Sequence, residues 1–239
     1  LVSLGISLSQ LGNEVDAGKC FMRAWQLDGR NVAVLRHAAS AMAYQGQIDE
    51  AVKLFQEAGN LGHRGLNARE RALIYNDWGV ALFRVGMAEE AGQKLMEAAD
   101  MDPTSVEPCM NLGLVSVQLG EFERAADAFE KTLALEPESR DLRVYLAVTL
   151  ILLNQCELAI ERMDEKAPDN PGQYEFWLGH AHLGAGNYEQ AARYFAQVLQ
   201  DTPANYQAVD GLGCALMLSG NYEDAIERFK TAISLRQDY

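Results

Sequence analysis

The stretch Gly186-Asn-Tyr-Glu-Gln-Ala191 decides the fold, because related stretches recur along the whole chain. The clearest copy is Gly220-Asn-Tyr-Glu-Asp-Ala225. The closing alanines of all copies stand at positions 17, 51, 91, 125, 159, 191 and 225, so the spacings are 34, 40, 34, 34, 32 and 34 residues. A fixed period of this size indicates a protein built of stacked repeats.

Each repeat has the pattern of two helices joined by a tight turn. In the last one, Val209, Leu212 and Leu216 are spaced as one face of a helix. Gly220 suits the left-handed residue that ends such a helix, and a second helix is expected over 222–235. The sequence therefore predicts antiparallel helical hairpins.

Two positions of each hairpin are restricted in size. The first helix carries a small residue at Gly5, Ala39, Gly79, Gly113, Ala147, Gly179 and Gly213. The second helix carries a large one at Phe21, Phe55, Leu95, Phe129, Met163, Phe195 and Phe229. With the recurring alanine and four closing prolines, this order resembles the tetratricopeptide-repeat (TPR) family. The resemblance covers nearly the whole chain and implies an all-α, right-handed α-solenoid of antiparallel helix-turn-helix repeats.

We expect a single array of seven repeats over residues 1–239, cut from a longer protein. The expected repeats are 1–31, 32–65, 72–105, 106–139, 140–171, 172–205 and 206–239, with an insertion at 66–71. Asn67 and Glu70 in the insertion have the spacing of a capping box, so the next helix should begin near Asn67 and be over a turn longer than its siblings. The glycine-rich residues 59–65 should form a loop. A local change of twist is expected near Lys166, where repeat five lacks its second small residue.

Composition restricts the class of partner. A net charge of −14 argues against nucleic acid or an anionic membrane surface, because both reward basic proteins. The longest nearly apolar run, 144–153, is too short for membrane insertion. Four widely separated cysteines without a C-x-x-C pair favour a reducing compartment. We therefore expect a cytoplasmic protein, with the periplasm as the alternative.

No pattern in the sequence indicates catalysis. The nucleophile-elbow, phosphate-loop, zinc-protease and EF-hand motifs are all missing. His180 and His182 are two residues apart, so on a helix they point in different directions and cannot share a metal. We therefore expect no enzyme activity, no metal site and no cofactor.

The TPR resemblance implies a ligand groove along the first helices. The positions carried over to this groove are Arg36, His37, Tyr44, Asn76, Asp77, Arg84, Met110, Asn111, Leu114, Tyr145, Val148, Ile151, Leu152, Phe176, Trp177 and His180. The groove would be polar at the front and apolar from repeat four onward. The carboxylate clamp of chaperone-binding TPR domains is not matched, because only Asn111 fits it.

An apolar groove suits a peptide or an amphipathic helix of another protein. The expected function is a non-catalytic protein–protein interaction scaffold, and self-association through the uncapped ends is a further expectation. Two alternatives stay open: a bacterial secretion or pilus-assembly subunit of the envelope, and the substrate-recruiting arm of an enzyme whose catalytic domain lies outside this chain. Phe176 and Trp177 could also be core residues, because Glu175 occupies the place of a large residue.

Overall fold

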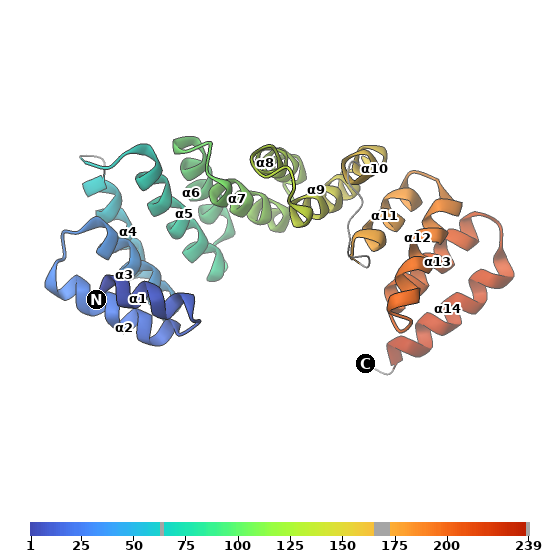
Figure 1. Ribbon diagram of the computed structural model, residues 1–239, viewed down its shortest axis with the longest axis horizontal. Coiled ribbons are helices and arrows are strands. Elements are labelled where there is room, and N and C mark those ends of the chain that lie inside the picture. The colour runs from blue at the N-terminus through green and yellow to red at the C-terminus, as the bar shows by residue number, and fades with distance from the viewer. Residues whose placement is uncertain (63–64, 165–172, 238–239) are drawn as a thin grey trace. The chain divides into compact units, whose positions relative to one another are not determined.

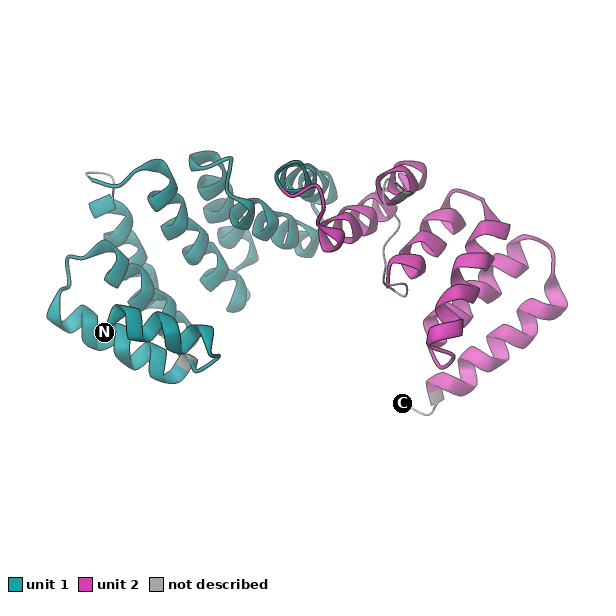
Figure 2. Cartoon of the chain, in the orientation of Figure 1, with its two compact units in different colours: residues 1–135 teal, residues 136–239 magenta. Residues whose placement is uncertain are grey.

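The computed structural model describes residues 1–62, 65–164 and 173–237. These residues form fourteen α-helices and no strand (Figure 1). The all-α fold expected from the repeat pattern is therefore confirmed. Contacts divide the chain into two compact units, unit 1 (Leu1–Leu135) and unit 2 (Glu136–Tyr239), shown in Figure 2. The division into seven repeats stays a prediction.

Unit 1 consists of four helical hairpins. Its helices are α1 (Val2–Gln10), α2 (Glu14–Leu27), α3 (Val32–Tyr44), α4 (Ile48–Gly62), α5 (Ala68–Arg84), α6 (Ala88–Met101), α7 (Val106–Leu119) and α8 (Phe122–Leu135). Each odd-numbered helix packs on the helix after it, and α3, α5 and α7 also contact one another in order. The first helices of successive hairpins therefore lie side by side.

Unit 2 repeats this arrangement with three hairpins. Its helices are α9 (Arg140–Leu152), α10 (Cys156–Asp164), α11 (Gln173–Gly184), α12 (Tyr188–Asp201), α13 (Tyr206–Leu218) and α14 (Tyr222–Gln237). The first helices α9, α11 and α13 contact one another in order, as in unit 1.

The turn inside each hairpin requires a left-handed backbone conformation. Glycines adopt it at positions 12, 46, 86, 120, 186 and 220, with φ between 75° and 89°. The remaining hairpin lacks this glycine, and Asn154 takes the same conformation there with φ of 58°. Asparagine tolerates this region better than most residues because its short side chain can hydrogen-bond locally.

The small and large positions of each hairpin meet in the structure. A Cβ atom placed on Gly113 would lie 2.5 Å from Cε1 of Phe129, and one on Gly5 would lie 2.6 Å from Cε1 of Phe21. Such distances are well inside van der Waals contact, so glycine is needed for the two helices to approach. The small residue of the first helix and the large residue of the second helix therefore face each other within one hairpin.

The predicted start of the helix after the insertion is confirmed. Asn67 caps α5, and its side chain accepts a hydrogen bond from the Glu70 amide at 2.9 Å. The Glu70 carboxylate accepts one in return from the Asn67 amide at 3.0 Å, which completes a capping box. α5 has 17 residues, against 12 to 14 in α3, α7, α9, α11 and α13, so it is over a turn longer than these first helices except α7, which is three residues shorter.

The predicted loop over 59–65 is wrong for residues 59–62, because α4 continues to Gly62, and residues 63–64 lie outside the described residues. Gly59 and Gly62 lie on the side of α4 that faces α5. A Cβ on Gly59 would be 3.5 Å from the Tyr75 hydroxyl, and one on Gly62 would be 3.3 Å from Cδ1 of Ile74. Packing against α5 therefore stabilises the helical conformation at these two glycines, although glycine has a low intrinsic preference for helices. The expected change of twist near Lys166 falls on residues 165–172, which lie outside the described residues.

Candidate functional site

Polar side chains join the first helices of unit 1 to one another. Nη1 of Arg36 on α3 lies 2.5 Å from Oδ2 of Asp77 on α5. Nδ2 of Asn111 on α7 donates to Oδ1 of Asn76 on α5 at 2.9 Å. Asn76 in turn donates a longer bond of 3.4 Å to Asp77. Nη2 of Arg36 also lies 3.1 Å from Nε2 of His37. Five of the expected groove residues, His37 included, therefore form one hydrogen-bonded chain across three helices.

The two charged groups of this polar chain, Arg36 and Asp77, pair with each other. The side chains of Arg36 and Asp77 are only 20% and 25% exposed, so each charge is shielded mainly by the other. Asn76 is buried. Breaking such a partly buried pair leaves an uncompensated charge, which makes the pair important for how the helices are held. The polar residues at the front of the expected groove thus hold α3, α5 and α7 together, and they also form part of the groove surface.

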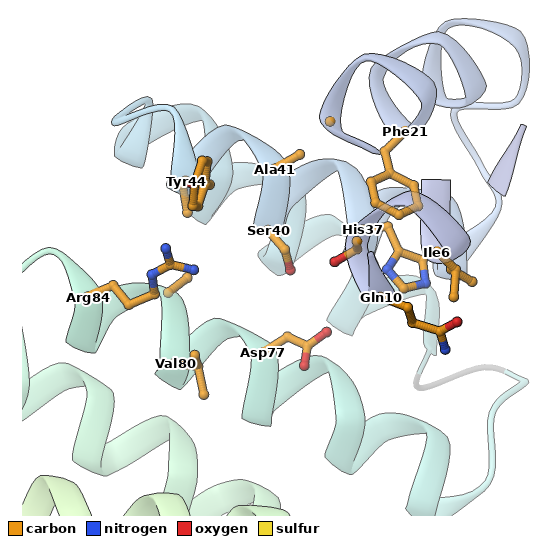
Figure 3. Close-up of a pocket in the computed structure, with 14 residues that line it drawn as sticks. Ile6, Gln10, Phe21, His37, Ser40, Ala41, Tyr44, Asp77, Val80 and Arg84 are labelled. Atoms are coloured by element: carbon orange, nitrogen blue, oxygen red, sulfur yellow. The ribbon is translucent and has the colours of Figure 1, made fainter. Parts of the chain in front are cut away.

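A cavity of about 320 Å³ opens beside this polar chain, and we call it the unit 1 pocket. Its walls come from the first helices α1, α3 and α5 and from the second helix α2 (Figure 3). The lining residues include Ile6 and Gln10 of α1, Phe21 of α2, His37, Ser40 and Tyr44 of α3, and Asp77, Val80 and Arg84 of α5. The ring of Phe21 on α2 stacks on His37 with centroids 4.7 Å apart. The pocket therefore combines an aromatic wall with several hydrogen-bonding groups.

Tyr44 and Arg84 stand together at one end of this pocket (Figure 3). The Arg84 guanidinium lies 4.8 Å from the centroid of the Tyr44 ring, a cation–π distance. Tyr44 is 47% exposed. Among the described residues no carboxylate pairs with Arg84. This end of the pocket offers an aromatic face and a cation that is free to meet a ligand.

The ionisation of the pocket is set by burial. Burial lowers the pKa of His37 from 6.5 to about 4, and the adjacent Arg36 guanidinium adds to the effect. Burial raises the pKa of Asp77, while the Arg36 guanidinium works against that rise. His37 is therefore neutral near pH 7 and can act as both hydrogen-bond donor and acceptor.

The other expected groove residues differ in exposure. On α7, Met110, Asn111 and Leu114 are half-buried. On α9 in unit 2, Tyr145 and Leu152 are exposed, at 41% and 51%, whereas Val148 and Ile151 are half-buried. The described structure thus gives α9 an apolar surface of its own.

The last three expected residues form an aromatic cluster on α11. Phe176, Trp177 and His180 are all half-buried, so they are neither fully exposed nor core residues. The Phe176 ring stands nearly perpendicular to Trp177, with centroids 5.2 Å apart, and to His180 at 4.6 Å. Phe176 also contacts the buried ring of Phe195 at 6.1 Å. The cluster therefore rests on the core with one side and faces a cavity with the other.

That cavity, which we call the unit 2 pocket, has a volume of about 800 Å³. Besides the α11 cluster, its walls include Val198 and Thr202 of α12, Tyr206 and Asp210 of α13, and Ile233 and Arg236 of α14. Sequence reasoning missed the residues from the second helices α12 and α14, and in unit 1 it missed Ile6, Gln10 and Phe21. The positions carried over from the family resemblance lie on the first helices of repeats two to six, so they include neither α1 nor any second helix.

The described residues contain no group of three His, Cys, Asp or Glu side chains that could hold a metal ion. None of the helices in the described part of the chain has the length and apolar character to cross a membrane. The four cysteines are free thiols, and burial raises the pKa of Cys109, Cys156 and Cys214. Both pockets offer aromatic faces and hydrogen-bonding groups to a ligand.

Comparison with known families identifies the repeats. Two family models, each described as a tetratricopeptide repeat, match residues 116–181 and 178–239. The chain is a TPR protein. The matched residues include the helices that line the unit 2 pocket.

Several curated proteins resemble this TPR protein. Over 78% of its length it is 26% identical to the BBSome complex member BBS4 of Bos taurus. Over 57% of its length it is 30% identical to the probable UDP-N-acetylglucosamine–peptide N-acetylglucosaminyltransferase SPINDLY of Hordeum vulgare. Over 61% of its length it is 28% identical to the type IV pilus assembly protein PilF of Pseudomonas aeruginosa. The chain spans 35%, 14% and 56% of these relatives, respectively.

Solved structures share the TPR fold. The Pseudomonas aeruginosa PilF structure superposes with a TM-score of 0.65 at 22% identity and covers 87% of this chain and 92% of that one. YrrB, described as a TPR protein with an unusual peptide-binding site, superposes with a TM-score of 0.63 at 24% identity and covers 77% of this chain and 93% of YrrB. At these identities the likeness concerns the fold.

Proposed function

We propose that this chain is a non-catalytic protein-interaction scaffold that binds a peptide or helix of another protein along the first helices of its hairpins. The observation that carries the proposal is the unit 1 pocket, which draws its walls from the first helices α1, α3 and α5. A segment lying across these helices could place one side chain in the cavity of about 320 Å³. YrrB, which has the same fold and is described as having an unusual peptide-binding site, supports this proposal.

The chemistry of the pocket favours an amphipathic segment. Ile6, Phe21 and Val80 supply apolar contact, while Ser40 and Gln10 supply hydrogen-bonding groups. Exposed aromatic and arginine side chains such as Tyr44 and Arg84 are the residues that most often dominate binding energy at interfaces. They stand at the end of the cavity, where a bound segment would cover them.

The test uses peptides displayed on phage, selected against the purified chain. We expect one related set of sequences to be enriched, and Tyr44→Ala to weaken the best peptide about tenfold, which corresponds to about 1.4 kcal/mol. Tyr222→Ala is the matched control, because Tyr222 is an exposed tyrosine on a second helix and lies in neither pocket. Failure to enrich any sequence, or equal losses in both variants, would refute the proposal.

A second candidate function is a subunit of a pilus-type assembly in a bacterial envelope. The match to PilF favours it, because that structure covers 87% of this chain. Cell fractionation of the source organism would test it: recovery with the envelope supports this role, and recovery in the cytosol removes it. The match to the SPINDLY transferase covers 14% of that protein, so an enzyme-recruiting role depends on whether a catalytic domain adjoins this chain.

A further inference from the structure

The unit 2 pocket combines aromatic faces from two helices. Phe176 and Trp177 meet at an interplanar angle of 79°, so their rings form a corner on α11. Tyr206 adds a third ring from α13. The face of an aromatic ring is electron-rich and attracts cations, most strongly for tryptophan.

Asp210 brings a carboxylate to the same cavity. The side chain is exposed, and it forms no hydrogen bond or ion pair with any residue that the structure describes. His180 in the same pocket does not neutralise it: burial lowers the His180 pKa, and this outweighs the opposing effect of the Asp210 carboxylate, so the ring is neutral near pH 7. The carboxylate is therefore available to a ligand.

The lining also has room for a long apolar stem. Val198 and Ile233 supply aliphatic surface from α12 and α14 within a cavity of about 800 Å³. Lysine and arginine side chains place their methylene groups along such surface while the charged end reaches a polar partner. Arg236 is the one basic side chain among the described lining residues, and it forms no ion pair with Asp210.

From these features we propose that the unit 2 pocket binds a cationic side chain, arginine or lysine, of the partner segment, with Asp210 as its counter-ion and Trp177 as its stacking surface. This inference rests on the proposed scaffold function and names the chemistry of the partner. An apolar side chain in the same place would remove water from the Asp210 carboxylate without giving it a partner, which is unfavourable. The net charge of −14 also attracts a basic partner over longer distances.

The proposal can be tested with small probes that need no knowledge of the partner. The probes are N-acetylarginine amide and N-acetylcitrulline amide, which have nearly the same shape but differ in charge. The readout is the indole N–H signal of Trp177 in ¹H–¹⁵N NMR spectra, assigned with the variant Trp177→Phe. The protein has three tryptophans, and the other two, Trp25 and Trp78, lie in unit 1 and serve as internal controls.

We expect the arginine probe to move the Trp177 signal in a saturable way, and the citrulline probe to move it at least about tenfold less effectively. Asp210→Asn should lower the affinity for the arginine probe about tenfold, because the counter-ion is lost. Arg236→Gln should raise the affinity for the arginine probe about threefold, because a competing positive charge is removed. Both positions are exposed, so the variants should fold, which far-UV circular dichroism verifies.

Three results would overturn the inference: equal binding of the citrulline probe, an unchanged affinity in Asp210→Asn, or a Trp177 signal that the arginine probe does not move. The scaffold proposal fails separately, when peptide selection enriches nothing. If peptides are enriched but lack basic residues and bind Asp210→Asn normally, the scaffold stands and the cationic pocket is refuted.

Discussion

The ring of Phe195 is held between two glycines of unit 2. A Cβ on Gly211 of α13 would lie 2.6 Å from Cζ of Phe195, and a Cβ on Gly179 of α11 would lie 2.8 Å from its Cε1. The ring is fully buried, so it has no open space to move into. The substitution Gly211→Ala therefore tests how tightly successive hairpins are packed.

Two effects decide the magnitude for Gly211→Ala. Overpacking a core by one methyl group costs about 1–3 kcal/mol. Alanine in a helix interior gains about 1 kcal/mol over glycine, and Gly211 lies inside α13. We expect overpacking to win and the variant to be destabilised by about 1 kcal/mol.

Gly92→Ala is the matched control in unit 1. Gly92 is also buried inside a helix, α6. A Cβ there would meet the Nη2 end of the Arg124 side chain at 3.3 Å, and the next atoms are 3.7 Å away. A flexible side-chain end can yield, so the helix preference should dominate and the variant should be stabilised by about 0.5–1 kcal/mol.

The assay is thermal and urea unfolding followed by far-UV circular dichroism. For a protein of this size 1 kcal/mol shifts Tm by about 2–4 °C, so the two variants should move in opposite directions. Phe195→Leu should reduce the loss caused by Gly211→Ala in a double-mutant cycle, because the smaller side chain makes room. Phe195 also contacts His180, with centroids 5.1 Å apart, so Gly211→Ala should alter Trp177 fluorescence in the neighbouring pocket. A Gly211→Ala protein as stable as Gly92→Ala would refute the packing argument.

Four further predictions follow from individual residues. Ala191→Leu should destabilise by about 1–3 kcal/mol in urea unfolding, because Ala191 is fully buried between helices; an unchanged midpoint would contradict this. Asn154→Gly should stabilise by about 0.5–1 kcal/mol, since φ is 58° there, and a lower Tm would count against it. His37 has a folded pKa of about 4, below 6.5, so the unfolded chain takes up the proton first and stability falls as pH drops from about 7 to about 4. His37→Phe should lose less stability over that range, and parallel pH profiles would exclude this role. Finally, Ile226 and Ile233 are exposed apolar side chains on α14. Light scattering should therefore show a mass that rises with protein concentration, and Ile226→Lys should abolish that rise; a constant mass in the unsubstituted protein rules out self-association.

Much of the fold follows from local patterns. The turn glycines, the pairing of Gly113 with Phe129 and the Asn67 capping box each depend on residues close in sequence or at a fixed spacing. Repetition adds to this, because the same pattern occurs several times and each copy supports the others. Asn154 could be placed in the turn frame for the same reason, although only the structure gave its left-handed conformation.

Residues 59–62 show where local patterns fail. Three glycines within seven residues favour a loop, yet α4 continues through Gly59 and Gly62 because α5 packs against them. A contact between two helices outweighs an intrinsic preference of about 1 kcal/mol per glycine. The sequence of residues 59–65 alone does not reveal that α5 packs against these glycines.

The sequence by itself determined the hairpin, its turn and the helix that carries each expected groove residue, since these depend on spacing within a repeat. Only the tertiary structure decided which side chains meet. It paired Arg36 with Asp77 across 41 residues of sequence, so a charge expected to face a ligand instead holds two helices together. It also brought Arg236 of α14 into the same cavity as Trp177 of α11. The physical reason is that a pocket is formed by several helices at once, and their separation in space is fixed by packing, which no single repeat encodes.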